Sequence, residues 1–270
     1  MQHTRPPAVA GSFYPRQSEA LAREVGQLLA AAAVDAAGPA VPKALVVPHA
    51  GYVYSGPTAA AAYARLAPWR DRLHRVVLLG PVHRMPVRGL ALPGAAAFAT
   101  PLGEVAVDQE AVAALAELPQ VVVSPAAHAL EHSLEVQLPF LQSVLADFRL
   151  LPLAVGDATP DEVAEVLLRV WGGPETLIVI SSDLSHYLPY RQAQACDRDT
   201  VSRILQLDGP LTHQQACGGT PLSGLLLAAR QHGLQPQLLD LRNSGDTAGD
   251  RARVVGYAAI AFTGDSDASH

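Results

Sequence analysis

Four titratable side chains lie just after three apolar runs of the sequence. His49 stands in PHAG behind the first run, His83 lies past the second, and Asp183 and His186 follow the third within SSDLSHY. If the runs are parallel strands, their carboxyl ends share one rim of the sheet, where loops converge and ligands bind in open α/β folds. We therefore expect these four side chains to line one crevice.

Metal binding is the chemistry that these residue types favour. Neutral imidazole is a preferred ligand of first-row transition metals, and two histidines with one carboxylate hold non-haem Fe(II) while leaving positions open for substrate and oxygen. His49 and His83 are the natural pair of histidines. The carboxylate candidates are Asp183, Glu135, Asp246 and Asp250, the last two in the loop NSGDTAGD. For Asp246, an ordinary turn aspartate is the alternative interpretation.

A second group of polar residues has the spacing of one helix face. His128, His132 and Glu135 are related as i, i+4 and i+7. The same stretch has the polar residues typical of a helix N-terminal turn, so capping is the competing interpretation. A role in orienting a metal-bound histidine is the most that this spacing supports.

Hydrolysis by a serine nucleophile is disfavoured. The stretch SSDLSHY contains serine, aspartate and histidine, but the chain has no G-x-S-x-G motif. Asp183 and His186 are also only three residues apart, which is not the separation expected of triad partners.

The order of apolar runs predicts the fold that must position these residues. Continuous apolar segments of strand length alternate with amphipathic helical segments, which is the pattern of βαβ units in a sheet covered on both faces. Strands are expected at 43–48, 74–80, 121–125, 148–156, 176–181 and 251–262. Helices are expected at 18–32, 57–67, 108–118, 131–145 and 159–171, with two more within roughly 189–233. The predicted class is a single α/β domain with a largely parallel central sheet.

No repeat or linker divides the chain. We expect one domain over residues 1–262, followed by a disordered tail at 263–270. Residues 86–107 have short alternating segments around a Pro-Leu-Gly turn, which favours a hairpin inserted at the edge of the sheet.

Composition excludes several classes of protein. The chain has 270 residues, enough to bury a sizeable core, and its apolar runs are broken before they reach the length of a membrane span. The N-terminus has no secretory signal pattern, so a cytoplasmic location is expected. A net charge of -6 with scattered basic residues argues against a nucleic-acid partner. Cys196 and Cys217 are too few for a disulfide framework and are expected to be small buried hydrophobic residues.

Seven ordered motifs resemble one protein family. They are RPPAVAGSFYP, PHAGYVYSG, LLGPVHR, EHSLEVQLPFL, SSDLSHY, CGGTPLSGLL and VVGYAAIAF, and they span nearly the whole chain. These motifs resemble the Memo family, known in prokaryotes as AmmeMemoRadiSam system protein B, which is similar in fold to the class III extradiol dioxygenases, the LigB-like enzymes. The resemblance implies Fe(II) held by two histidines and a carboxylate, with His49 and His83 as the histidines. It also implies Asp183 and His186 as the catalytic pair, with His186 as the acid/base.

The third metal ligand is where this sequence departs from some relatives. Some eukaryotic Memo proteins have a cysteine in the loop before the last strand, whereas NSGDTAGD contains none. Cys217 belongs to the separate CGGTPLSG motif and is not expected to replace it. Asp246 lies closest to the required position and would restore a site of two histidines and one carboxylate.

These observations lead to one leading hypothesis for the function, two alternative functions and one expectation about pathway partners. The leading hypothesis is a non-haem Fe(II) oxidoreductase, dioxygenase-like, of unknown substrate, with Cu or Zn as alternative metals. One alternative is a non-catalytic binding module that uses the same crevice for a small molecule, a peptide or a partner protein. A metallohydrolase with Zn is another. The family resemblance also implies radical-SAM and AMMECR-like proteins as pathway partners.

Overall fold

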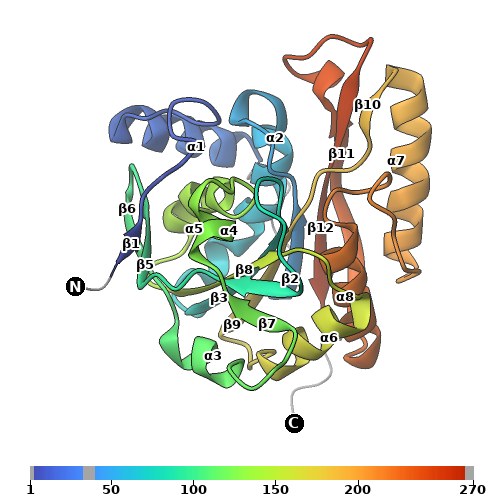
Figure 1. The fold of residues 1–270 in the computed structure, drawn as a ribbon. Coiled ribbons are helices and arrows are strands. Elements are labelled where there is room, and N and C mark those ends of the chain that lie inside the picture. Colours follow the sequence, from blue (N-terminus) through green and yellow to red (C-terminus); the bar gives the residue numbers. More distant parts are fainter. Residues whose placement is uncertain (1–2, 33–39, 265–270) are drawn as a thin grey trace.

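The fold is built around one mixed nine-stranded sheet (Figure 1). The structure is a computed structural model that describes residues 3–32 and 40–264. The strand order is β10-β12-β2-β9-β3-β8-β4-β7, with β11 paired to β12.

Four parallel strands form the centre of the sheet. They are β2 (Pro42–Val47), β9 (Thr176–Ser181), β3 (Arg75–Pro81) and β8 (Arg149–Val155). Apart from the first residue of β3 and of β8, and Lys43 in β2, their residues are buried. Burial on both faces explains why these strands stand out in the sequence as continuous apolar runs.

The outer strands make the sheet mixed rather than purely parallel. On one side they are β12 (Val254–Thr263), β11 (Gln235–Asn243) and β10 (His186–Leu188); on the other they are β4 (Leu90–Leu92) and β7 (Val121–Val123). β12 runs antiparallel to β2, β10 and β11, and β4 runs antiparallel to β8. The expected parallel character therefore holds for the central strands and for the β4–β7 pair.

Helices cover both faces of the sheet. In β2, Leu45 and Val47 belong to one core cluster and Ala44 and Val46 to the other, because successive side chains of a strand point to opposite faces. The first cluster includes residues of α1 (Ser18–Ala32), α2 (Tyr52–Tyr63), the 3₁₀ helix η2 (Ala64–Trp69), α4 (Pro125–Ala129) and α5 (Leu138–Val144). The second includes residues of α3 (Gln109–Ala114), α6 (Pro160–Arg169), α7 (Tyr190–Leu205) and α8 (Gly219–Gln231). Two short 3₁₀ helices complete the description, η3 (Glu135–Gln137) and η4 (Ser244–Asp246).

The hairpin expected within 86–107 is present, but outside the main sheet. β5 (Ala97–Thr100) and β6 (Gly103–Ala106) are antiparallel and form a three-stranded sheet with β1 (Thr4–Arg5). The short strand before the hairpin, β4, is the part of this region that joins the main sheet.

Two helices begin several residues away from their predicted first residue. The helix expected at 57–67 begins at Tyr52, so Pro57 lies inside α2 instead of at its start. The helix expected at 131–145 is reduced to η3 and α5, which leaves residues 131–134 as an irregular turn. This irregular turn matters because it carries polar residues of the candidate site.

The structure also bears on the expectations about membrane spans and about the C-terminal tail. None of the helices in the described part of the chain combines the length and apolar character needed to cross a membrane. Of the tail expected at 263–270, Thr263 ends β12 and Gly264 follows it, while 265–270 lie outside the described residues. The domain limits of 1 and 262 stay a prediction.

Candidate metal centre

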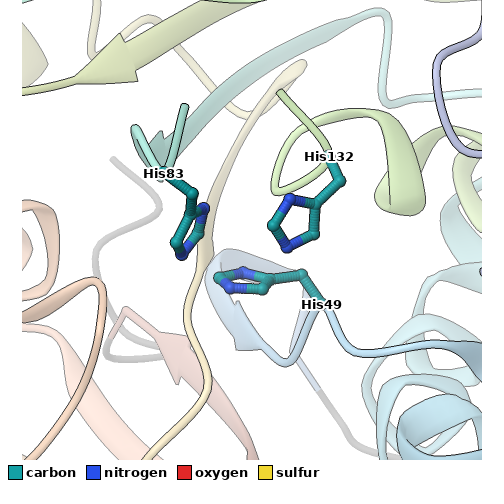
Figure 2. Close-up of side chains that lie close together, drawn as sticks. All are labelled: His49, His83 and His132. Carbon is teal, nitrogen blue, oxygen red and sulfur yellow. The ribbon is translucent and has the colours of Figure 1, made fainter. Parts of the chain in front are cut away.

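Three imidazole rings from distant parts of the chain lie together (Figure 2). His49, His83 and His132 each offer one ring nitrogen, and these atoms lie within 4.8 Å of one another. The ring centroids are 5.2 Å apart for His49 and His83, 5.4 Å for His49 and His132, and 4.6 Å for His83 and His132. Residues 3–32 and 40–264 contain no other group of three His, Cys, Asp or Glu with this proximity.

The ends of the parallel strands bring two of these histidines together. His49 follows β2 by two residues, and its backbone N–H donates to Asp183 Oδ1 at 2.8 Å, in the loop after β9. His83 follows β3 by two residues. His132 comes from the irregular turn between α4 and η3. The crevice expected at the carboxyl ends of the strands is therefore where the cluster lies.

A single buried carboxylate hydrogen-bonds one of the rings and contacts a second. Glu131 Oε1 lies 2.9 Å from His83 Nδ1 and 3.3 Å from His132 Nδ1, while Oε2 accepts from the His83 backbone N–H at 2.6 Å. Burial by itself raises the pKa of Glu131, but hydrogen bonds from His83 and from the Ser133 backbone outweigh it and hold the pKa at about 2. The ionised carboxylate accepts a hydrogen bond from the Nδ1–H of His83. The Nε2 lone pair of that ring is then free for a metal.

The third ring is buried and held from the other side of the cluster. His49 Nδ1 lies 2.9 Å from Ser181 Oγ. Burial, followed by the nearby His83, lowers the pKa of His49 to about 3. Burial and the neighbouring His49 lower the pKa of His132 to about 4. Both imidazoles are therefore neutral near pH 7, which is the form that binds transition metals.

A thiol adjoins one of the three rings, that of His49. Cys217 Sγ lies 3.3 Å from His49 Nε2 and accepts from the Asp183 backbone N–H at 3.3 Å. Burial, then the Asp183 carboxylate, raises the pKa of Cys217 to about 12, so the sulfur keeps its proton near neutral pH in the absence of a metal. Since metal binding replaces thiol protons, Cys217 is a candidate fourth ligand. Cys196 and Cys217 are both only partly buried, so the expectation that they are small buried hydrophobic residues is wrong for their burial.

Of the three histidines, His83 borders a cavity of about 1010 Å³. His83, His186 and Cys217 are among its lining residues, and its walls also include Met85 and Tyr187. His186 begins β10, and its Nδ1 lies 2.8 Å from the Leu184 carbonyl oxygen. A carbonyl only accepts hydrogen bonds, so Nδ1 carries the proton and the Nε2 lone pair is left to take up another. The structure thus brings His186 to the same cavity as His83.

Comparison with known proteins assigns the chain to a family. The sequence model described as "Memo-like protein" matches residues 5–261. The chain belongs to the Memo-like family. A "MEMO1 family protein" of Methanococcoides burtonii is 38% identical over 276 residues, covering 95% of this chain and 98% of the relative. A "MEMO1 family protein" of Aquifex aeolicus is 36% identical over 271 residues, covering 96% and 98% of the two chains.

A solved structure has a similar fold at low sequence identity. The uncharacterized protein JW3007 from Escherichia coli K12 superposes with a TM-score of 0.51 at 17% identity, over 82% of this chain and 99% of that one. The likeness supports the α/β architecture with helices on both faces of the sheet.

In this Memo-like chain, Asp246 does not join the histidines. It lies in η4, where its Oδ2 accepts from the Asn243 backbone N–H at 3.0 Å and its Oδ1 accepts from the Tyr190 hydroxyl. The loop folds back on the end of β11, so the carboxylate caps a 3₁₀ turn. Asp250 likewise accepts from the Ala252 backbone N–H at 2.6 Å. The geometry offers His132 as the third ligand in place of Asp246.

The other two members of the 128–135 group have structural partners. Glu135 is fully buried and pairs with Arg5, and it also accepts from the Ala8 backbone N–H at 2.7 Å. His128 is buried, with Nε2 2.7 Å from the Ala91 carbonyl oxygen. The spacing therefore pointed to the segment that contains His132, but Glu131, and not Glu135, is the carboxylate that contacts the candidate ligands His83 and His132.

Proposed function

We propose that this Memo-like protein binds one transition-metal ion through His49, His83 and His132 and uses it as an oxidoreductase on a small molecule in the adjoining cavity. The observation that carries the proposal is the convergence of three imidazoles whose Nδ1 atoms face partners in the protein. Polar partners behind metal-binding histidines are the usual means of orienting them.

The donor set fits an intermediate or soft divalent ion. Imidazole suits Zn, Cu, Fe and Ni, and an adjacent thiol favours these over Mg or Ca. Fe(II) is the ion we propose for the redox function. A bound Fe(II) would supply the centre at which substrate and oxygen exchange electrons.

The residues around the ion have separate tasks in this proposal. His186 lines the cavity and accepts a proton from the substrate through Nε2, as a general base within hydrogen-bond reach does. Asp183 holds the backbone of His49 in place through their 2.8 Å hydrogen bond. The apolar part of the cavity wall, which includes Met85, favours a substrate with an apolar part.

Oxygen consumption tests the oxidoreductase proposal. The purified chain is loaded anaerobically with Fe(II) or with Zn(II) and then mixed with oxygen and a panel of small aromatic and aliphatic substrates. The proposal predicts substrate-dependent oxygen uptake with Fe(II) and none with Zn(II). Substrate hydrolysis by the Zn(II)-loaded protein, without oxygen uptake, would support the metallohydrolase instead.

The second proposed function, non-catalytic binding, is supported by exposed large side chains at the cavity. Met85 is 46% exposed and Tyr187 is 61% exposed, and both line the cavity beside His83 and His186. A cytoplasmic small molecule, peptide or partner protein, including the radical-SAM and AMMECR-like proteins, could dock there. Binding that survives chelation of the metal would favour this function over the enzyme.

A further inference from the structure

We infer that Ser181 is a positioning residue for the metal centre: its hydroxyl, committed to the Ser133 carbonyl oxygen, keeps the hydrogen of His49 on Nδ1 and leaves Nε2 bare for the metal. This inference rests on the proposed metal-binding function. It adds one tautomer of His49 as a requirement, and it assigns that tautomer to the turn that also carries His132.

Three polar groups surround the Ser181 hydroxyl at the end of β9. Its Oγ lies 2.6 Å from the Ser133 carbonyl oxygen, 2.8 Å from Gln137 Nε2 and 2.9 Å from His49 Nδ1. All four residues are buried, so bulk water does not compete for these hydrogen bonds. The hydroxyl has one hydrogen to donate and two lone pairs with which to accept.

The Ser133 carbonyl determines where the hydroxyl hydrogen lies. A carbonyl oxygen can only accept, and 2.6 Å is a hydrogen-bond distance at which two oxygens with no hydrogen between them would repel each other. The Ser181 hydrogen therefore points at Ser133, and none is left for the imidazole. Since His49 Nδ1 faces the same oxygen at 2.9 Å, it must donate a hydrogen of its own. The neutral ring then has its lone pair on Nε2.

Gln137 fills an acceptor position of the hydroxyl without setting the tautomer. Its Nε2 also donates to the Pro48 carbonyl oxygen at 2.9 Å, and its Oε1 accepts from the Tyr63 hydroxyl at 2.9 Å. The end of the amide that faces Ser181 is therefore a donor, which cannot take the hydroxyl hydrogen away from Ser133. Loss of this donor would leave the bond between Ser181 and Ser133 in place.

The residue that commits the hydroxyl also holds the turn of a candidate ligand. Ser133 directly follows His132, and its own hydroxyl donates to the Pro81 carbonyl oxygen at the end of β3, at 2.9 Å. Through its two oxygens, Ser133 therefore joins the turn to the ends of β3 and β9. The position of His132 and the tautomer of His49 depend on the same contact.

The opposite tautomer also has an acceptor within reach, so loss of Ser181 should change the ring. Cys217 Sγ lies 3.3 Å from His49 Nε2, and sulfur is a weak acceptor. Without the Ser181 oxygen, Nδ1–H would be a buried donor with no partner there, which is costly. Nε2–H facing the sulfur then becomes the better-bonded form, and the lone pair that a metal needs is lost from Nε2.

The test uses matched variants of Ser181. Ser181→Ala and Ser181→Val both remove the hydroxyl, whereas Ser181→Thr resembles the valine variant in size and retains it. Gln137→Leu is the control, because it removes a donor to the hydroxyl but leaves the bond between Ser181 and Ser133. Thermal unfolding monitored by circular dichroism identifies the variants that remain folded.

Nitrogen-15 NMR of the metal-free protein reads the tautomer of His49 directly. We expect protonated Nδ1 in the unmodified protein, in Ser181→Thr and in Gln137→Leu, and a large share of protonated Nε2 in each folded variant without the hydroxyl. Protonated Nε2 in the unmodified protein would overturn the inference, and this result does not depend on any variant folding. An equal shift in Gln137→Leu would also overturn it, because the packing around the hydroxyl would then be responsible.

Co(II) titration, read by visible absorbance, measures the consequence for the metal. Ser181→Ala and Ser181→Val should each weaken Co(II) binding by about tenfold or more, and Ser181→Thr should restore most of the affinity. Equal affinity of the unmodified protein and a folded variant without the hydroxyl would overturn the positioning role. If the unmodified protein bound no metal at all, the proposed function would fail, while the NMR spectra would still show whether Ser181 sets the tautomer.

Discussion

Glu131 holds His83 at two points, accepting from the ring Nδ1 at 2.9 Å and from the backbone N–H at 2.6 Å. The same carboxylate accepts from the backbone N–H groups of His132 and Ser133, each at 2.9 Å. The turn that supplies one metal-site histidine is therefore wrapped around the carboxylate that orients another.

Replacing Glu131 with glutamine should weaken metal binding without removing any histidine. The amide has one acceptor oxygen in place of two, so it cannot satisfy all four donors. We expect a 10- to 100-fold lower affinity for Co(II) or Fe(II), the usual range for partners behind metal ligands. The matched control is Glu104→Gln, an exposed glutamate in β6. Unchanged affinity in the Glu131 variant would show that the carboxylate does not orient the rings.

Cys217 should give the bound metal a recognisable spectrum. Its sulfur lies 3.3 Å from His49 Nε2, close enough to coordinate an ion held by the rings after a small adjustment. The Co(II)-loaded protein should therefore show a thiolate-to-metal charge-transfer band that Cys217→Ser lacks and Cys196→Ser retains. Absence of the band in the unmodified protein would limit the centre to nitrogen ligands.

His186 should affect turnover but not metal affinity. It lines the cavity but does not belong to the histidine cluster. With a substrate found by the oxygen-uptake screen, His186→Ala should bind Fe(II) as the unmodified protein does and consume oxygen roughly 10²- to 10⁴-fold more slowly, because a general base is lost. Unchanged oxygen uptake would exclude His186 as the proton acceptor.

The buried ion pair between Arg5 and Glu135 should be important for stability. Arg5 is 4% exposed and Glu135 is fully buried, and the Arg5 guanidinium also donates to the backbone carbonyls of His128 and Glu131. Glu135→Ala leaves the Arg5 charge buried without its partner, which costs about 3–5 kcal/mol of unfolding free energy. Urea denaturation measures this change, and Arg88→Ala, in an exposed pair with Glu162, serves as a control with a much smaller effect. Similar midpoints for the two variants would contradict this assignment.

The sequence predicts most reliably the location of site residues that directly follow a buried strand. His49 and His83 follow buried parallel strands, whose continuous apolar residues are easy to recognise, so their common location could be predicted. β11 was not predicted, since most of its residues are only half buried and it lacks a continuous apolar run.

The third histidine depended on tertiary structure. His132 was assigned to a helix, whereas it lies in a turn whose shape is set by Glu131 accepting from backbone N–H groups. Cys217 reaches the site because the segment before α8 packs against the loop after β9, where Asp183 contacts it. Neither relationship has a signature in local residue spacing.

The ligand set itself is the central claim, and anaerobic Fe(II) titration by calorimetry tests it most directly. The decisive comparison is between His132→Ala and Asp246→Ala, with His49→Ala and His83→Ala as reference variants. We predict one ion per chain in the unmodified protein and in Asp246→Ala, and loss of this binding in all three histidine variants. Stoichiometric binding by His132→Ala together with its loss in Asp246→Ala would contradict the three-histidine centre.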